Sequence, residues 1–109
     1  MAYSEKLAQR VRKILAPYGA LAEIKMFGGL CLTLRGNMTC GIVGEDLMVR
    51  VGPERYLKTL KEPGARPMDF TGRPMKGFLF VSPAGTKTPK ALSKWVRWCV
   101  DFISTLPDK

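Results

Sequence analysis

The sequence contains no histidine, the residue most often used as a general acid or base near neutral pH. It has only three cysteines, and no two of them form a C-x-x-C pair. A structural zinc site takes four ligands, chiefly from these two residue types. We therefore expect no metal site. We expect Cys31, Cys40 and Cys99 to be buried, reduced thiols, because free cysteine behaves as a small hydrophobic residue.

Long hydrophobic runs are also absent from the sequence. None approaches the roughly 18 apolar residues that a membrane-spanning helix needs. A charged amphipathic segment follows Met1 directly. We therefore expect a cytoplasmic protein with no signal peptide, no membrane anchor and no role at a membrane.

Acidic residues are scarce, with nine Asp and Glu against eighteen Lys and Arg, for a net charge of +9. The sequence shows neither an evident carboxylate pair nor a G-x-S-x-G motif, so we expect no catalytic residue, no cofactor and no enzyme activity. The positive charge favours polyanionic partners such as nucleic acid or an acidic protein. The basic residues are scattered along the chain, so no compact nucleic-acid-binding arm is evident.

What the sequence does contain is a helical pattern near each end. Residues 4–18 predict a helix that Ser4 caps and Gly19 ends, with apolar residues at helical spacing. Residues 88–105 predict another helix, which Thr88 caps. The apolar stripe of this last helix consists of Leu92, Trp95, Val96, Cys99, Phe102, Ile103 and Leu106.

Between these helices, apolar and polar residues alternate with the period of two that half-buried strands require. We predict strands over residues 30–35, 38–43 and 47–51, joined by a two-residue turn at 36–37 and a three-residue turn at 44–46. This register makes one face almost wholly apolar, with Leu30, Leu32, Leu34, Gly41, Val43, Leu47, Val49 and Val51. The other face is half polar, with Thr33, Arg35, Cys40, Ile42, Met48 and Arg50.

A short helix that begins near residue 53 and a buried strand over residues 77–81 complete the order α-βββ-α-β(β)-α. Hairpins produce a mainly antiparallel sheet, and an apolar sheet face needs helices packed on it. We therefore predict a single α+β domain over residues 1–109, with two layers.

Three segments together resemble the N-terminal domain of the TfoX/Sxy family: KMFGG at 25–29, LMVRVGPE at 47–54 and GARPMDFTGRPMKG at 64–77. The resemblance runs from about residue 23 to residue 107. It implies a two-layer, secretion-chaperone-like fold and kinship with bacterial regulators of natural competence, which act with the transcription machinery. The full-length regulators carry a second, helical C-terminal domain, whereas this chain stops at Lys109.

The segment 64–77 repeats Arg-Pro-Met and holds one acid, Asp69, among three cations, Arg66, Arg73 and Lys76. One hypothesis is structural, in which Asp69 forms a partly buried ion pair with an arginine and holds the segment closed. The alternative is a site for a small anion, in which these cations join Arg50 to bind a carboxylate or phosphate.

A second candidate surface lies on the last predicted helix. Lys94 and Arg97 are expected on its outer side, with Trp98 nearer that side than the apolar stripe. Tryptophan and arginine are enriched among residues that dominate protein interfaces, so these three residues form a candidate contact site for a protein partner.

We therefore expect a small regulatory or adaptor domain that acts through protein contacts, linked to transcription regulation by its resemblance. The partner would belong to the transcription machinery or be a second copy of this chain. The alternatives are direct nucleic-acid binding through the +9 surface and binding of a small anion by Arg50, Arg66 and Arg73.

Overall fold

The computed structural model describes residues 3–19, 21–26, 28–67 and 77–106, which form helices and one antiparallel sheet. The elements follow in the order α1 (Glu5–Leu15), η1 (Ala16–Tyr18), β1 (Leu21–Met26), β2 (Gly29–Leu34), β3 (Asn37–Val43), β4 (Asp46–Arg50), α2 (Pro53–Thr59), β5 (Ala65–Pro67), β6 (Phe78–Val81), α3 (Pro83–Thr86) and α4 (Pro89–Ile103). None of the described helices is long and apolar enough to cross a membrane.

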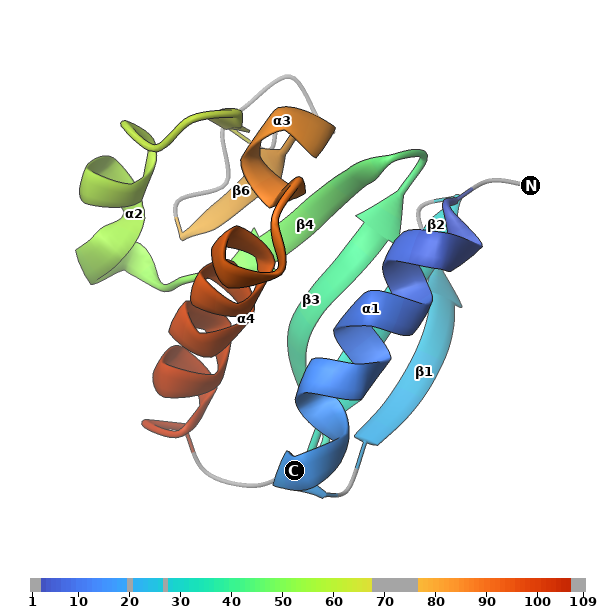
Figure 1. Cartoon of the computed structure of the whole chain (residues 1–109). Coiled ribbons are helices and arrows are strands. Elements are labelled where there is room, and N and C mark those ends of the chain that lie inside the picture. Colours follow the sequence, from blue (N-terminus) through green and yellow to red (C-terminus); the bar gives the residue numbers. More distant parts are fainter. Residues whose placement is uncertain (1–2, 20, 27, 68–76, 107–109) are drawn as a thin grey trace.

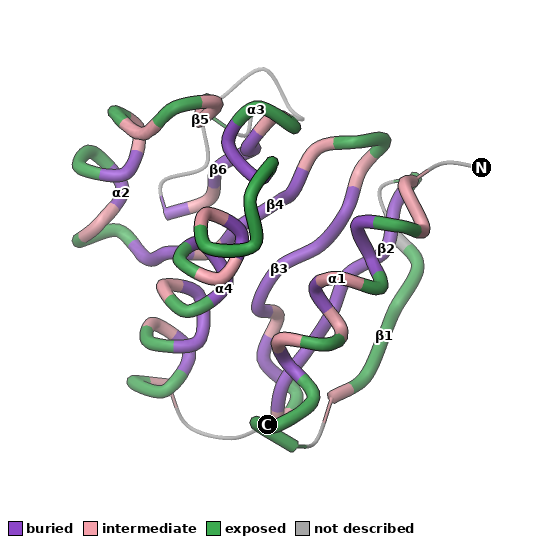
Figure 2. Tube along the Cα trace, viewed as in Figure 1, coloured by how far each residue is buried: buried purple, intermediate pink, exposed green. Residues whose placement is uncertain are grey.

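The sheet has six strands in the order β1-β2-β3-β4-β6-β5, and every neighbouring pair is antiparallel. Figure 1 shows α1 and α4 side by side on one face of this sheet, and both helices contact β3. The predicted α+β fold with two layers is therefore confirmed. Figure 2 shows the buried residues concentrated where these helices face the central strands.

The predicted signals at the start of α1 and α4 are confirmed. The Ser4 side chain accepts a hydrogen bond from the Leu7 amide at 3.2 Å, and the Thr88 side chain accepts one from the Ala91 amide at 3.1 Å. Each bond satisfies a backbone donor that the first turn of a helix would otherwise leave unpaired. The predicted helix over 4–18 is divided into α1 and η1, and Gly19, with a φ of 73°, ends η1 before β1 begins.

One strand, β1, was missing from the predicted order. Residues 22–26 do alternate apolar and charged side chains, a strand signal that the prediction overlooked. Ala22, Glu23, Ile24 and Lys25 are nevertheless all exposed, and the strand pairs with β2 along its length. The predicted order also omitted the short helix α3, whereas the buried strand expected at 77–81 appears as β6.

Both predicted turns were wrong by one residue, the first in its position and the second in its length. Leu34 pairs with Asn37, so the first turn is Arg35-Gly36, and Arg35 takes a φ of 51° although it is not glycine. Val43 pairs with Asp46, so the second turn has two residues, 44 and 45, instead of three. This shorter turn and an unpredicted β-bulge in β3 offset each other in β4, and Leu47 and Val49 do lie in the main core as predicted.

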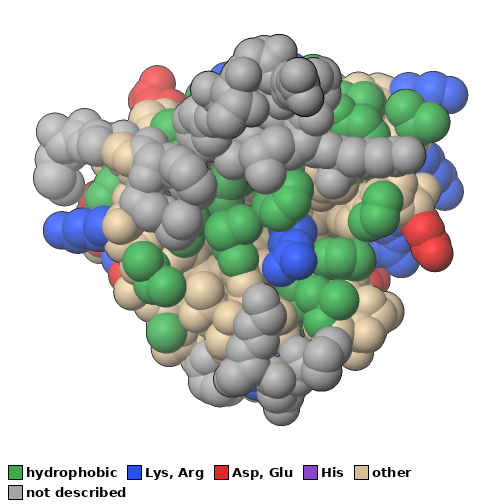
Figure 3. All heavy atoms as spheres, turned by 180° about the vertical axis from the view of Figure 1, so that it is seen from behind, with side chains coloured by type: hydrophobic (Ala, Val, Ile, Leu, Met, Phe, Trp, Pro, Cys, Tyr) green, Lys and Arg blue, Asp and Glu red, His purple; other side chains and the backbone are tan. Residues whose placement is uncertain are grey.

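The assignment of β3 to the two faces was wrong because β3 contains a β-bulge, at which its register with β2 shifts between Leu32 and Thr33. One extra residue in a strand moves every later side chain to the other face. Cys40 pairs with Leu32 and Val49, and Ile42 pairs with Leu30 and Leu47, so both point into the helix-covered core. Gly41 and Val43 belong to the opposite, second face of the sheet. That face carries its own buried cluster of Cys31, Met48 and Phe80, against which Met38, Val43 and Phe78 pack. Figure 3 shows hydrophobic side chains gathered there.

An ion-pair network ties α1 to β1. Arg12 donates to both carboxylate oxygens of Glu23, at 2.5 and 2.9 Å, and to Glu5 at 2.6 Å. The hydrogen bond from Arg12 lowers the pKa of Glu23, so this pair stabilises the fold at pH values above the unfolded carboxyl pKa. That contribution is lost as the pH falls through the folded-state pKa. Because these side chains are about one-third exposed, we expect about 1 kcal/mol or less from each pair.

We predict that Gly52→Ala destabilises the protein by about 2–4 kcal/mol. Gly52 has a φ of 87° and a ψ of 157°, a conformation that residues with a Cβ atom rarely adopt. An added Cβ would also lie 2.3 Å from the Phe102 ring. Urea denaturation measures the loss, and Gly44→Ala is the matched control, because its φ is 59° and no atom lies within 4 Å of the added Cβ. The control should lose only about 1 kcal/mol, and an equal loss in both variants would contradict this account.

Candidate functional site

Helix α4 has two chemically different sides. Trp95, Val96, Cys99 and Ile103 are buried on the side that faces the sheet. Lys90, Lys94, Arg97 and Asp101 are exposed on the other side. A helix turns through 3.6 residues, so burial of the apolar stripe fixes the direction in which the charged residues point.

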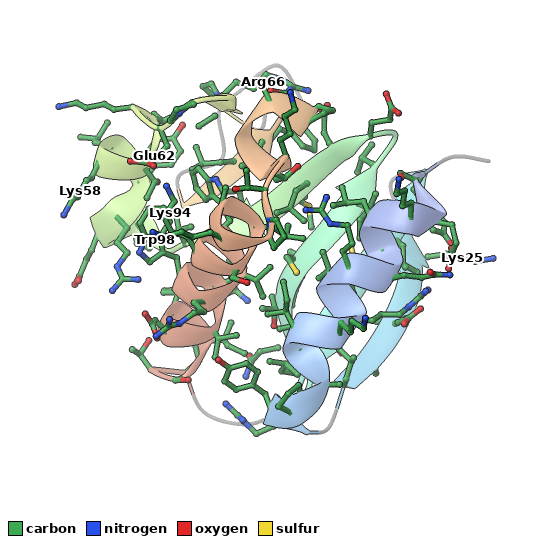
Figure 4. All side chains as sticks on the ribbon, viewed as in Figure 1. Lys25, Lys58, Glu62, Arg66, Lys94 and Trp98 are labelled. Atoms are coloured by element: carbon green, nitrogen blue, oxygen red, sulfur yellow. The ribbon has the colours of Figure 1, made fainter. Side chains whose placement is uncertain are left out.

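The outer side of α4 borders a cavity of about 560 Å³, which we call the α4 groove. It is lined by Thr88, Lys90, Ala91, Ser93, Lys94, Arg97, Trp98 and Asp101. Figure 4 shows Lys94 and Trp98 on the side of α4 that faces α2, with Glu62 and Lys58 close by. The volume lies within the usual range for sites that bind small ligands or peptide side chains.

Trp98 is held in a defined position at this groove. Its ring meets the buried Trp95 ring edge to face, with centroids 5.1 Å apart and an interplanar angle of 88°. The Lys94 ammonium lies 5.3 Å from the Trp98 ring centroid. Trp98 is only partly buried, so part of a large aromatic side chain remains open to a partner while its position is fixed by contacts from below.

The groove has a positive charge balance. Among the described residues of its lining, Lys90, Lys94 and Arg97 are three cations, and Asp101 is one acid. Asp101 also accepts a hydrogen bond from Arg55 at 3.4 Å. The Arg55 guanidinium, which lies outside the described lining of the groove, therefore partly neutralises the Asp101 carboxylate.

The Lys94 ammonium also contacts the carboxylate of Glu62 at 2.5 Å. The two side chains are 43% and 31% exposed, so water and salt screen the pair and leave it worth about 1 kcal/mol or less. Glu62 therefore places a carboxylate against a cation of the groove. A carboxylate of a partner protein could form the same contact with Lys94 by displacing Glu62.

The structure brings together the three residues that the sequence assigned to a partner surface, since Lys94, Arg97 and Trp98 all line the α4 groove. It also adds groove residues that the sequence reasoning missed, among them Lys90 and Ser93. Both lie at helical spacing from Lys94 and Arg97, and that spacing is the signal that could have identified them. The contact with Glu62 joins distant parts of the chain and has no such signal.

The two described residues of the predicted anion site, Arg50 and Arg66, lie elsewhere, on strands of the sheet. Arg50 donates to the Met38 carbonyl at 3.2 Å, and its guanidinium lies 5.6 Å from the Phe78 ring centroid and 5.2 Å from that of Phe102. Arg66 contacts the Asp46 carboxylate at 2.6 Å. Its guanidinium also lies 5.0 Å from the Phe80 ring centroid.

Asp69, Arg73 and Lys76 lie outside the described residues, so the ion pair proposed for Asp69 stays a prediction. Among the residues that are described, the acid found beside Arg66 is Asp46, 20 positions away in the sequence. The structure therefore separates Arg50 and Arg66, at the strands, from Lys94 and Arg97, at the α4 groove.

The three thiols are buried, as predicted. Burial raises the pKa of Cys31 and that of Cys40, and it raises the pKa of Cys99 to about 12. The reactive thiolate is therefore strongly disfavoured at neutral pH. In the ranges that the structure describes, no three His, Cys, Asp or Glu residues are grouped so that they could hold a metal ion.

We predict that the two tryptophans differ sharply in what they contribute to stability. Trp95 is 1% exposed, so Trp95→Ala should cost about 3–5 kcal/mol by opening a cavity in the core. Trp98→Ala should cost much less, about 1–2 kcal/mol, because it removes a partly exposed ring and one aromatic contact. Chemical denaturation of both variants measures the difference. A loss for Trp98→Ala equal to that for Trp95→Ala would show that Trp98 is a core residue and not part of a binding surface.

Comparison with known proteins gives one match. The family model described as the TfoX N-terminal domain matches residues 13–103 of this chain. A search of curated proteins found no match, and neither did a search of solved structures. The family match begins near the end of α1 and runs to the end of α4, and it includes all the described residues that line the α4 groove. The chain belongs to the TfoX N-terminal domain family, as its sequence motifs predicted.

Proposed function

We propose that this domain is a regulatory adaptor that binds an acidic segment of a partner protein in the α4 groove. The observation that carries the proposal is the position of Trp98, which is fixed by Trp95 and Lys94 inside a cavity lined by cations. A few aromatic and arginine residues supply most of the binding energy in many protein interfaces. Trp98 and Arg97 offer both types in one cavity.

The chemistry of the groove indicates the chemistry of the partner. Its cations favour Asp and Glu side chains, which would be attracted over a distance and oriented on arrival. The Trp98 ring favours one apolar side chain placed among those acids. We therefore propose an acidic segment with a central Leu, Ile or Phe. The central side chain would pack on the Trp98 ring, and the flanking carboxylates would bind the cations of the groove.

Binding without catalysis is part of this proposal. The buried thiols are poor nucleophiles because the thiolate form is disfavoured, which supports a role that depends on surface contacts. The proposed setting is transcription regulation in the cytoplasm. It draws support from membership of the TfoX N-terminal domain family and from the likeness to competence regulators.

Nucleic acid is the competing polyanion for a chain with a net charge of +9. One feature of the groove favours a protein instead. Trp98 is a single ring in the described lining, whereas single-stranded nucleic acid is usually bound by several aromatic residues in succession.

We predict that Arg97→Glu weakens binding of an acidic peptide roughly tenfold, which corresponds to about 1.4 kcal/mol. The probe is a synthetic peptide rich in Asp and Glu with one central Leu, titrated while tryptophan fluorescence or heat is recorded. Arg97→Glu places a negative charge inside the groove, where the peptide carboxylates would bind. Trp98→Ala should weaken the same peptide by removing its apolar contact.

Lys13→Glu is the matched control, because it makes the same change of charge at an exposed position on α1. It should leave peptide binding nearly unchanged at physiological salt. A single-stranded oligonucleotide serves as the competitor. If the oligonucleotide binds with a steep salt dependence and the peptide does not bind, the domain is a nucleic-acid-binding module and the adaptor proposal is wrong.

A further inference from the structure

Strand β1 forms one edge of the sheet. Within the described part of the chain it pairs with β2 alone, so the backbone groups along its outer edge have no strand partner there. Figure 1 shows β1 at the outside of the molecule, and Figure 2 shows it exposed over most of its length. An open edge of this kind is a template for pairing with another strand.

The side chains of β1 combine an exposed apolar residue with two opposite charges. Ile24 is 51% exposed, an unusual degree for a large aliphatic side chain in a strand. Glu23 and Lys25 flank it and share the opposite face of the strand, since alternate residues point the same way. Lysine at a sheet edge normally discourages pairing, but here the opposite charge lies two positions away on the same strand.

We propose that two copies of this chain form a symmetric dimer by antiparallel pairing of their β1 edges. In such a pair, a two-fold axis relates the strands, and each contact occurs twice. The two sheets would then join into one continuous sheet, with the helices of both copies on the same side.

The geometry of antiparallel pairing restricts the register. Only alternate residues of an edge strand direct their backbone groups outward, so residues that face each other across the axis must both be odd-numbered or both be even-numbered. One permitted register puts Ile24 opposite Ile24 of the second copy. In that register Glu23 lies opposite Lys25 of the second copy, and Lys25 opposite its Glu23.

The neighbouring registers are excluded by charge. A shift by two residues in one direction puts Glu23 opposite Glu23, and the same shift in the other direction puts Lys25 opposite Lys25. Like charges directly opposite each other destabilise a strand pair, whereas opposite charges stabilise it. The sequence of β1 therefore favours one register, with two attractive charge pairs and an Ile24 contact on the axis.

The strongly basic character of the chain does not oppose this contact locally. Arg12 holds Glu23 and Glu5 at the β1 side of α1, with contacts of 2.5 and 2.6 Å. Together with Lys25, these residues give two positive and two negative charges beside the edge, so the net charge there is balanced. The hydrogen bonds from Arg12 also hold the Glu23 carboxylate beside the edge, where a second Lys25 would reach it.

Sedimentation velocity over a range of concentrations tests the dimer in the full chain. We expect a reversible monomer–dimer equilibrium, with backbone amides of β1 exchanging hydrogen more slowly as the concentration rises. Ile24→Asp should abolish the dimer by placing two carboxylates on the axis. A wild-type protein that stays monomeric at millimolar concentration overturns the proposal.

Lys25→Glu tests the register, because it converts both attractive pairs into Glu–Glu pairs. We expect dimerisation to weaken roughly tenfold or more. The substitution also lowers the net charge of +9 by two, which would by itself reduce repulsion and favour association. A weaker dimer is therefore the opposite of what the change in net charge alone would produce. Lys61→Glu, at an exposed position beyond α2, makes the same change of charge and should not weaken the dimer.

Mixing two variants gives the sharpest result. Glu23→Lys alone creates Lys–Lys pairs, and Lys25→Glu alone creates Glu–Glu pairs, so each should be monomeric. A mixture of the two restores two attractive pairs across the axis and should form a heterodimer. Circular dichroism checks that Glu23→Lys still folds without its bond to Arg12. Failure of two folded variants to associate, or unchanged dimerisation of Lys25→Glu, would contradict the proposed pairing.

Discussion

The packing of α4 against β3 and β4 is the interaction on which the rest of the structure depends. Trp95 is the largest fully buried side chain, and it lies on α4 with Leu92, Val96 and Cys99. Their burial removes apolar surface from water, the dominant favourable term in folding. It also fixes the rotation of the helix about its own axis. Because that rotation is fixed, Lys94, Arg97 and Trp98 form the wall of a groove on the outer side.

The two proposed contact surfaces lie at different places in the same two-layer fold. The α4 groove belongs to the helix layer above β3 and β4, whereas the proposed dimer contact uses the β1 edge, two strands beyond β3. A dimer through β1 would leave both grooves open. Two grooves on one rigid sheet would bind a partner with two acidic segments more tightly than one groove could.

Much of the fold could be predicted from the sequence because its signals are local. The Ser4 and Thr88 caps, the stripe on α4 and the strand at β6 each depend on residues within a few positions. The strand β1 also has a local signal, the alternation of apolar and charged residues over 22–26, which was overlooked. Its position at an edge of the sheet, with Ile24 exposed, depends on long-range pairing that no local pattern reveals. The turn at Arg35 was misplaced because a positive φ is rare for any residue other than glycine.

The candidate site was predictable only in part. Lys94, Arg97 and Trp98 could be grouped because helical spacing alone puts them on one side of α4. The acid partners of the candidate cations lie far away in the sequence, and no periodicity reveals them. Lys94 meets Glu62 across 32 positions, and Arg66 meets Asp46 across 20. A carboxylate near in sequence is therefore a poor guide to the partner of an arginine.

The most direct test of the central claim is acrylamide quenching of tryptophan fluorescence in two single-tryptophan variants, Trp95→Phe and Trp98→Phe. If α4 packs as described, the remaining Trp98 should be quenched readily, whereas the remaining Trp95 should be strongly shielded. Addition of the acidic peptide should then protect Trp98 alone. Equal quenching of the two residues, or ready quenching of Trp95, would show that α4 is not fixed in this rotation and would contradict the account.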